Sequence, residues 1–194
     1  MDKYISDQIA EAGRVIDLIA KDEVLRARVR LAAEAAIECF RSGGKILLAG
    51  NGGSAADAQH IAGEFVSRFA FDRPGLAAIA LTTDTSILTA IGNDYGYERL
   101  FARQVQALGR PGDVFIGYST SGKSPNVLRA FEEARAHGLF CIGFTGNRGG
   151  PMIGLCDVAL EVPSSDTPKI QEGHLVLGHI LCGLVENAMF APAA

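Results

Sequence analysis

The first forty residues carry apolar side chains at helical spacing. From Ile5 to Phe40, apolar positions recur every three or four residues among charged ones, and the pattern is broken near Lys21-Asp22. This period is typical of amphipathic helices. We therefore predict two helices, one on each side of the break.

Beyond a Ser-Gly-Gly turn at residues 42–44, the pattern changes to short and nearly continuous apolar runs. Such runs, ended by small or turn-forming residues, are typical of buried strands. Five strands are predicted, at residues 45–50, 76–81, 113–119, 139–146 and 157–163. Segments with helical character lie between and after them, at residues 54–69, 85–91, 97–108, 125–137 and 170–190.

Strands and helices thus alternate along the chain. Buried strands separated by helices indicate a parallel sheet that is covered on both faces. We therefore expect an α/β fold, a three-layer, doubly wound, five-stranded parallel sheet with an N-terminal helical extension. In such sheets ligands bind beyond the carboxyl ends of the strands, so functional residues are expected in the loops there.

The composition narrows the class of protein. With 194 residues and 48% hydrophobic side chains, we predict one domain over residues 1–194, with the N-terminal helices at 1–42 and the α/β core at 43–194. The net charge of −4 offers no basic stripe for nucleic acid.

The N-terminus lacks a signal-peptide segment, and no run of about 18 uncharged apolar residues predicts a membrane span. A cytoplasmic protein is expected.

A glycine-rich segment, residues 50–55 (GNGGSA), follows the first predicted strand. Glycines let the backbone approach a ligand closely, and a helix that begins near Ser54 offers free N–H groups to an anion. A plain tight turn is the simpler alternative. The segment also fits the loose dinucleotide pattern G-x-G-x-x-A. That pattern needs an acidic residue at the end of the second strand, where this chain has Thr82-Thr83, with Asp84 slightly beyond.

The helix behind this loop carries a candidate pair of metal ligands. His60 and Glu64 stand four residues apart, a spacing that places both side chains on one face and lets them reach one ion. The alternative is a solvated surface contact, which is the commoner role of such a pair.

A hydroxyl-rich segment, residues 119–126 (STSGKSPN), follows the third predicted strand. Its four hydroxyl groups, its glycine and the start of a helix at Pro125 form a neutral nest suited to a phosphate monoester. A serine-rich turn with one capping serine is the alternative. Its position beyond a central strand favours phosphate binding.

Two other segments hold candidate polar residues. Residues 91–96 (IGNDYG) are compatible with a plain turn, or offer Asn93 and Asp94 to substrate hydroxyl groups. The apolar helix near the C-terminus contains Gln171, His174 and His179. Buried histidines are usually structural, and spacing alone does not choose between these two as a partner for the metal pair.

Together, GNGGSAADAQH with Glu64 four residues on, GNDYG, STSGKS and IQEGH-x4-H resemble the sedoheptulose 7-phosphate isomerases (phosphoheptose isomerases) of the SIS, or sugar isomerase, domain family. The likeness runs from about Asp2 to Phe190. STSG-x-S alone is typical of the wider SIS family, whereas the full combination is much more specific. The family fold is a five-stranded, parallel, flavodoxin-like sheet, which agrees with the fold expected from the apolar pattern.

The resemblance also implies roles for individual residues. It implies one zinc ion per subunit, held by His60, Glu64, Gln171 and His179, and leaves His174 as a structural residue. Glu64 is implied as base and His179 as acid in an aldose-ketose isomerisation that serves heptose, lipopolysaccharide or capsule synthesis. The sugar phosphate is expected to contact Asn51, Gly52, Gly53, Glu64, Asn93, Asp94, Ser119, Thr120, Ser121, Ser124 and Gln171.

The N-terminal helices carry more apolar surface than a monomer needs to hide, and relatives in this family are homotetramers. We therefore expect a homotetramer with these helices at its interfaces.

Two alternatives remain for the function. One is an isomerase of another sugar phosphate, and the other is a non-catalytic SIS protein that binds the replication initiator. The complete set of four ligands favours catalysis, because a pure binding protein has no chemical use for it.

Overall fold

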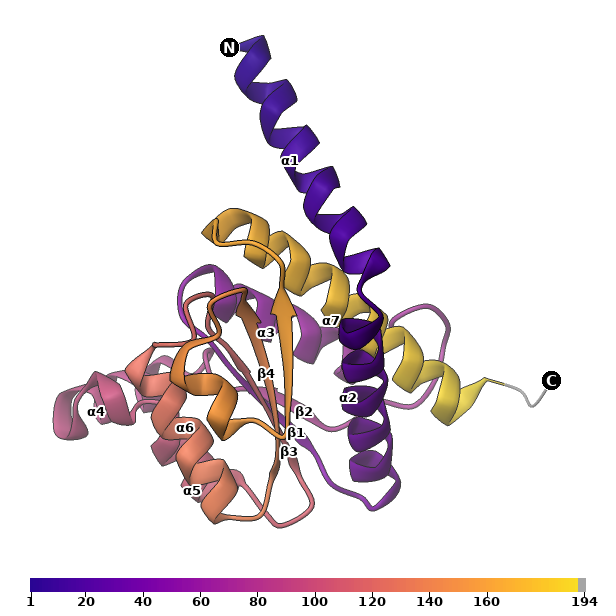
Figure 1. The fold of residues 1–194 in the computed structure, drawn as a ribbon. Helices are drawn as coiled ribbons and strands as arrows, with labels where there is room; N and C mark the ends of the chain where they lie inside the picture. Colours follow the sequence, from indigo (N-terminus) through magenta and orange to yellow (C-terminus); the bar gives the residue numbers. More distant parts are fainter. Residues whose placement is uncertain (192–194) are drawn as a thin grey trace.

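Five strands form one all-parallel sheet at the positions of the five apolar runs (Figure 1). The computed structural model describes residues 1–191, so the last three residues of the predicted domain lie outside the described ones. The strands are β1 (Ile46–Ala49), β2 (Ala78–Ala80), β3 (Val114–Tyr118), β4 (Phe140–Gly146) and β5 (Val158–Val162). Their order in the sheet is β2-β1-β3-β4-β5. The predicted fold class is confirmed.

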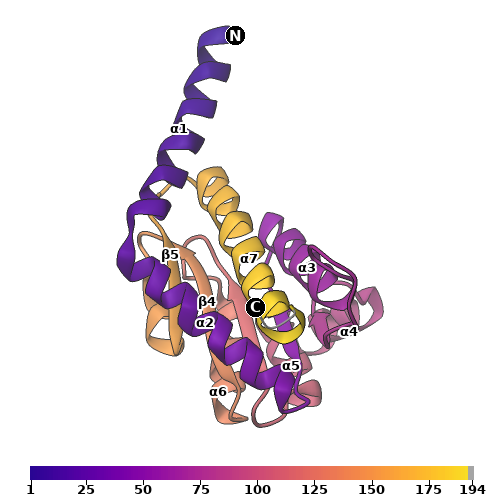
Figure 2. The ribbon, with the colours of Figure 1, turned by 90° about the vertical axis from the view of Figure 1, so that its right-hand side faces the viewer.

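Helices cover both faces of the sheet. Alternate side chains of a strand point to opposite faces, and Ile46 and Leu48 of β1 join one apolar cluster while Leu47 and Ala49 join another. The helices on the first face are α2 (Glu23–Arg41), α3 (Gly53–Val66) and α7 (Thr167–Phe190), which Figure 2 shows side by side. Those on the second are α4 (Thr85–Tyr95), α5 (Ala102–Leu108) and α6 (Pro125–Ala136).

The two N-terminal helices meet at the predicted break. α1 (Asp2–Lys21) ends there, and Asp22 caps α2 by accepting a hydrogen bond of 2.9 Å from the backbone N–H of Leu25. α1 projects from the rest of the molecule (Figure 1), and its buried residues are Val15 and Ile19. Most of its apolar surface is therefore left exposed in a single chain.

The structure differs from the predicted elements in the segment after β2. α4 continues to Tyr95, so Asn93 and Asp94 form the last turn of a helix and not a plain turn. Gly96, with a φ of 82°, ends that helix in a conformation that favours glycine. The predicted helix at 97–108 is divided into a short 3-10 helix (Tyr97–Arg99) and α5, and a second 3-10 helix, Gly150–Leu155, was not predicted.

α7 is long and apolar enough to cross a membrane by length and composition alone. It lies instead against the sheet and packs on α2 and α3. Ile170, Leu177 and Val185 are buried there. Its apolar composition is thus that of a partly buried core helix.

Candidate active site

The site lies where the strand order changes direction. The chain runs from β1 to its neighbour β2 on one side and then returns to β3 on the other, with Ala49 of β1 opposite Gly117 of β3. At such a switch point the loops after the two central strands diverge and leave a crevice for a ligand. Both segments singled out in the sequence, residues 50–55 and 119–126, begin here.

The loop after β1 requires glycine for two different reasons. A Cβ at Gly50 would lie 2.5 Å from the carbonyl oxygen of Ser54, and Gly52 has a φ of +57°. A Cβ at Gly53, the first residue of α3, would lie 2.5 Å from Nε2 of Gln171. The glycines therefore bring the backbone of this loop directly against the amide of Gln171.

The loop after β3 gathers its hydroxyl groups at the start of α6. Ser124 precedes the helix, and its Oγ lies 2.9 Å from the Oγ of the buried Ser119. The backbone N–H of Lys123 donates to Oγ of Ser121 at 3.2 Å. Gly122 has a φ of +63° and packs against the carbonyl oxygen of Gly149. The hydroxyl groups of Ser119, Ser121 and Ser124 thus lie in the turn that leads into the N-terminus of a helix, which suits an anion.

A pair of amides joins these two loops, and sequence reasoning assigned no role to one of them. Nδ2 of Asn51 donates to Oδ1 of Asn126 at 2.8 Å, and Nδ2 of Asn126 donates back to Oδ1 of Asn51 at 2.9 Å. The hydroxyl of Tyr97 also donates to Oδ1 of Asn51. Asn126 is 1% exposed. No spacing rule points to such a pair, because its members lie 75 positions apart.

The predicted substrate contacts Asn93 and Asp94 lie in the last turn of α4. Both are exposed, and Nδ2 of Asn93 donates to Oδ1 of Asp94 at 2.7 Å. Their role at the substrate stays a prediction.

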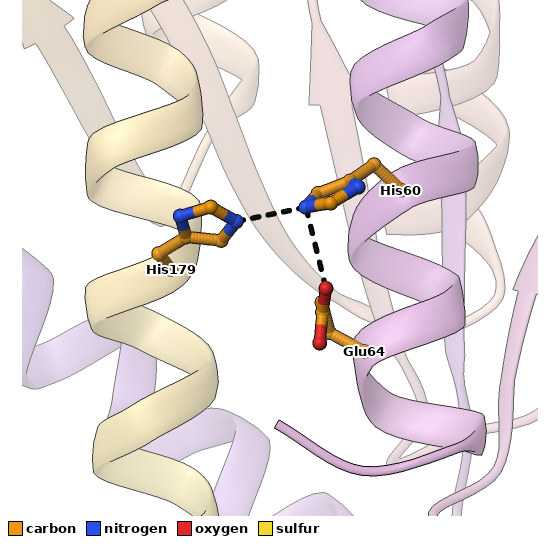
Figure 3. Close-up of side chains that lie close together, drawn as sticks. All are labelled: His60, Glu64 and His179. Carbon is orange, nitrogen blue, oxygen red and sulfur yellow. Dashed lines mark hydrogen bonds and ion pairs between the residues drawn. The ribbon is translucent and has the colours of Figure 1, made fainter. Parts of the chain in front are cut away.

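Three side chains from two helices converge on one point (Figure 3). His60 and Glu64 extend from α3 toward His179 on α7. Nε2 of His60 lies 2.8 Å from Nε2 of His179 and 3.3 Å from Oε1 of Glu64. His60 is exposed, and the other two are half-buried. The structure thus chooses His179, and not His174, as the partner of the pair on α3.

The donor set fits a zinc ion. Imidazole nitrogen and carboxylate oxygen are among the atoms that zinc binds, and ligand atoms around one tetrahedral zinc lie roughly 3.3 Å apart. The three donor atoms here lie within 4.8 Å of one another. Gln171, the fourth predicted ligand, lies about two helical turns before His179, and its amide is beside Gly53. Its role as a ligand stays a prediction.

Comparisons with known proteins show the family to which this chain belongs. The sequence pattern of the SIS domain matches residues 9–146. The chain is 74% identical over 187 residues to the phosphoheptose isomerase of Burkholderia pseudomallei, a match that covers 96% of this chain and 95% of that protein. The chain belongs to the phosphoheptose isomerases of the SIS domain family.

Solved structures of phosphoheptose isomerases have the same fold. The enzyme of Neisseria gonorrhoeae superimposes with a TM-score of 0.90 at 44% identity, over 96% of this chain and 98% of that one. The enzyme of Francisella tularensis gives a TM-score of 0.91 at 37% identity, over 95% and 97% of the two chains. The N-terminal helices and the α/β core are therefore both shared with these relatives.

Two further titratable groups lie on the helices that carry the converging side chains of this phosphoheptose isomerase. Burial raises the pKa of Asp57, three residues before His60, to about 6, although His60 acts in the opposite direction. Burial lowers the pKa of His174 to about 4, against the effect of its hydrogen bond to the carbonyl oxygen of Thr145. His174 is fully buried and therefore neutral near pH 7, as expected of a structural histidine.

Proposed function

We propose that this chain is a zinc-dependent isomerase that interconverts sedoheptulose 7-phosphate and D-glycero-D-manno-heptose 7-phosphate in the cytoplasm. Its product would supply bacterial heptose for lipopolysaccharide or capsule. The observation that carries the proposal is the convergence of His60, Glu64 and His179 between α3 and α7, in a chain so similar to a phosphoheptose isomerase.

The reaction needs a base, an acid and a group that stabilises charge on oxygen. A proton must leave C1 of the ketose, an enediol must form, and a proton must return to C2 of the aldose, while oxygen protons also move. Glu64 is suited to be the base because its carboxylate is half-buried and lies 3.3 Å from Nε2 of His60. His179 faces it across the group from α7 and is suited to be the acid.

Zinc bound by these residues would supply a Lewis acid that orients and polarises the substrate oxygens. Glu64 would then serve both as ligand and as base. The predicted set of ligands is His60, Glu64, Gln171 and His179.

Ser119, Thr120, Ser121 and Ser124 would hold the phosphate, far from the reacting carbons. Binding energy from such a remote group can position the reacting atoms against the base. Asn51, Gly52, Gly53, Asn93, Asp94 and Gln171 complete the proposed set of substrate contacts.

The exposed apolar face of α1 supports a homotetramer. Tyr4, Ile5 and Ile9 are 69%, 54% and 68% exposed in the single chain. A projecting helix with such a face needs a partner to cover it. Static light scattering checks this, and a monomer in solution would contradict it.

Metal analysis combined with a turnover assay tests the proposed function. Purified protein should contain one zinc ion per subunit and convert sedoheptulose 7-phosphate. Chelation should abolish turnover, and added zinc should restore it. Zinc-free protein with full activity would overturn the metal role, and a preference for another ketose phosphate would overturn the substrate.

A further inference from the structure

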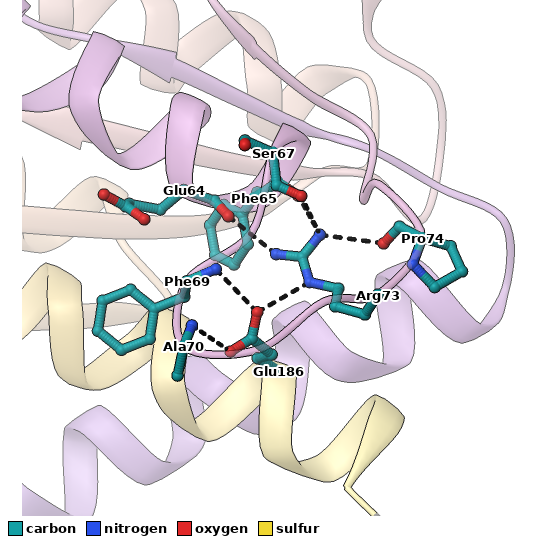
Figure 4. Close-up of polar contacts among 8 residues, drawn as sticks. All are labelled: Glu64, Phe65, Ser67, Phe69, Ala70, Arg73, Pro74 and Glu186. Atoms are coloured by element: carbon teal, nitrogen blue, oxygen red, sulfur yellow. Dashed lines mark hydrogen bonds and ion pairs between the residues drawn. The ribbon is translucent and has the colours of Figure 1, made fainter.

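A buried ion pair joins the segment that leads from α3 to β2 with helix α7 (Figure 4). Nε of Arg73 donates to Oε1 of Glu186 at 3.0 Å, and the two side chains are 2% and 1% exposed. The two residues lie 113 positions apart. Buried charges are costly unless they are paired and hydrogen-bonded. The other hydrogen bonds of these two side chains show which parts of the backbone the pair holds in place.

The guanidinium of Arg73 caps the end of the helix that carries His60 and Glu64. The last carbonyl groups of a helix have no partner within it, and a cation there also interacts favourably with the helix dipole. Nη2 donates to the backbone oxygen of Glu64 itself at 2.8 Å. Nη1 donates to the backbone oxygens of Phe65 (2.6 Å), Ser67 (3.3 Å) and Pro74 (3.0 Å).

The carboxylate of Glu186 binds the same segment from the side of α7. It accepts hydrogen bonds from the backbone N–H groups of Phe69 at 2.8 Å and Ala70 at 2.7 Å. Burial acts most strongly on the pKa of Glu186 and would raise it, but these N–H groups and Arg73 together outweigh burial and lower it. Glu186 is therefore ionised near neutral pH. It lies about two helical turns after His179 on the same helix.

The segment held in this way also reaches His179. The ring of Phe69 lies 5.6 Å from the ring of His179, centroid to centroid. It also lies close over Gly183, where an added Cβ would be 3.3 Å from the Phe69 ring. One loop therefore contacts the backbone of Glu64 through Arg73 and the imidazole of His179 through Phe69.

We propose that Arg73 and Glu186 are a positioning pair for the metal group, which sets the distance and orientation between Glu64 on α3 and His179 on α7. The proposal rests on the proposed zinc-dependent function. Neither residue reaches the substrate, because both are buried. Their effect passes through the ligands, so metal affinity and kcat should respond more than KM.

Two conservative variants test the pair, each chosen to keep the fold. Arg73→Lys keeps the positive charge beside Glu186 but lacks the planar fork that donates to several carbonyl groups at once. Glu186→Gln keeps the size of the side chain and removes its charge. The matched control is Asp113→Asn, at the far end of the sheet. Asp113 is 2% exposed, and its carboxylate accepts hydrogen bonds from the backbone N–H groups of Lys45 and Arg110. It also pairs with the side-chain ammonium of Lys45.

Three quantities are measured for each protein: the Kd for zinc, by competition of the metal-free protein with a chromophoric chelator; kcat and KM for sedoheptulose 7-phosphate at saturating zinc; and Tm. We expect the Kd for zinc to rise about tenfold or more in Arg73→Lys and Glu186→Gln, as for other residues that orient metal ligands. We also expect kcat to fall while KM stays within a factor of about three. Asp113→Asn should lower Tm and leave the zinc Kd and kcat unchanged.

The outcomes separate the pair from the proposed function. If the two variants lose Tm but match Asp113→Asn in zinc Kd and kcat, the positioning role is overturned. If one variant does not fold, the other decides, and if neither folds the pair is structural only and the proposal fails. A wild-type protein that neither binds zinc nor turns over sedoheptulose 7-phosphate would instead overturn the proposed function.

Discussion

The two halves of the candidate site are built in opposite ways. The hydroxyl-rich loop is six consecutive residues between β3 and α6, held by contacts such as that between Ser119 and Ser124. The metal group joins side chains 119 positions apart, from helices tied together by Arg73 and Glu186. One half is local in the sequence, and the other depends on the tertiary structure.

We therefore expect substitutions in the two halves of the site to affect different kinetic constants. Changes in the metal group should lower kcat, because they affect the reacting atoms. Changes in the hydroxyl loop should mainly raise KM, because the phosphate is remote from those atoms. The following predictions test this separation, from the largest expected effect to the smallest.

Glu64→Gln should give the largest loss. Removal of the general base is expected to lower kcat by at least about 100-fold, with KM changed only a few-fold. A coupled assay on the purified variant measures both. A variant with a near-normal rate would show that Glu64 is not the base.

Gly122→Ala should disrupt the hydroxyl loop. The φ of +63° disfavours any other residue, and a Cβ would overlap the carbonyl oxygen of Gly149. We expect KM to rise by about tenfold or more, from a cost of at least about 1.4 kcal/mol in phosphate binding. The zinc content should be unchanged. Equal losses in zinc content and KM would argue against two separable halves.

His174 should make the free energy of unfolding of this protein depend on pH. Its pKa falls from 6.5 to about 4 on folding, so between these values the unfolded chain binds a proton that the folded chain does not. Stability from this residue is thus lost as pH falls from 6.5 toward 4, at up to about 1.4 kcal/mol per pH unit.

The comparison with His174→Gln isolates this effect. Asp57, whose pKa is raised to about 6, acts in the opposite direction and is present in both proteins. Urea unfolding of the metal-free proteins at several pH values should show that the stability of wild type relative to the variant declines with acid. A constant difference across the range would exclude His174 as the source.

Ser124→Ala should have the smallest effect of the four. It removes one hydroxyl from the loop and the contact with Ser119. The loss of a hydrogen bond worth about 1 kcal/mol corresponds to a rise in KM of roughly fivefold. The kcat should stay near the wild-type value, and a selective fall in kcat would mean that this loop takes part in the chemistry.

The sheet was predictable because its signal is local. Each strand lies in a short apolar run, and in β1 (Ile46–Ala49) all four residues are buried, although Ile79 of the edge strand β2 is exposed. The end of α4 was missed because Asn93 and Asp94, which favour turns, occupy the last turn of a helix that only Gly96 terminates.

The site was predictable only in part, for the same reason. The hydroxyl loop stands in the sequence as one segment. The partner of His60 and Glu64 could not be chosen from spacing, and His179 came from the resemblance before the structure placed it there. Nothing in the sequence marks Arg73 or Glu186, because their contacts join distant segments. The seven-carbon substrate rests on the relatives and not on the geometry.

The position of His179 in α7 also orders the assembly of the enzyme during synthesis. A ribosome completes His60, Glu64 and Arg73 and all five strands before it makes α7. All five strands are therefore made while the metal group still lacks His179 and Arg73 still lacks Glu186. A nascent or truncated chain without α7 therefore cannot form the three-residue group, so the candidate metal site exists only once α7 has been made.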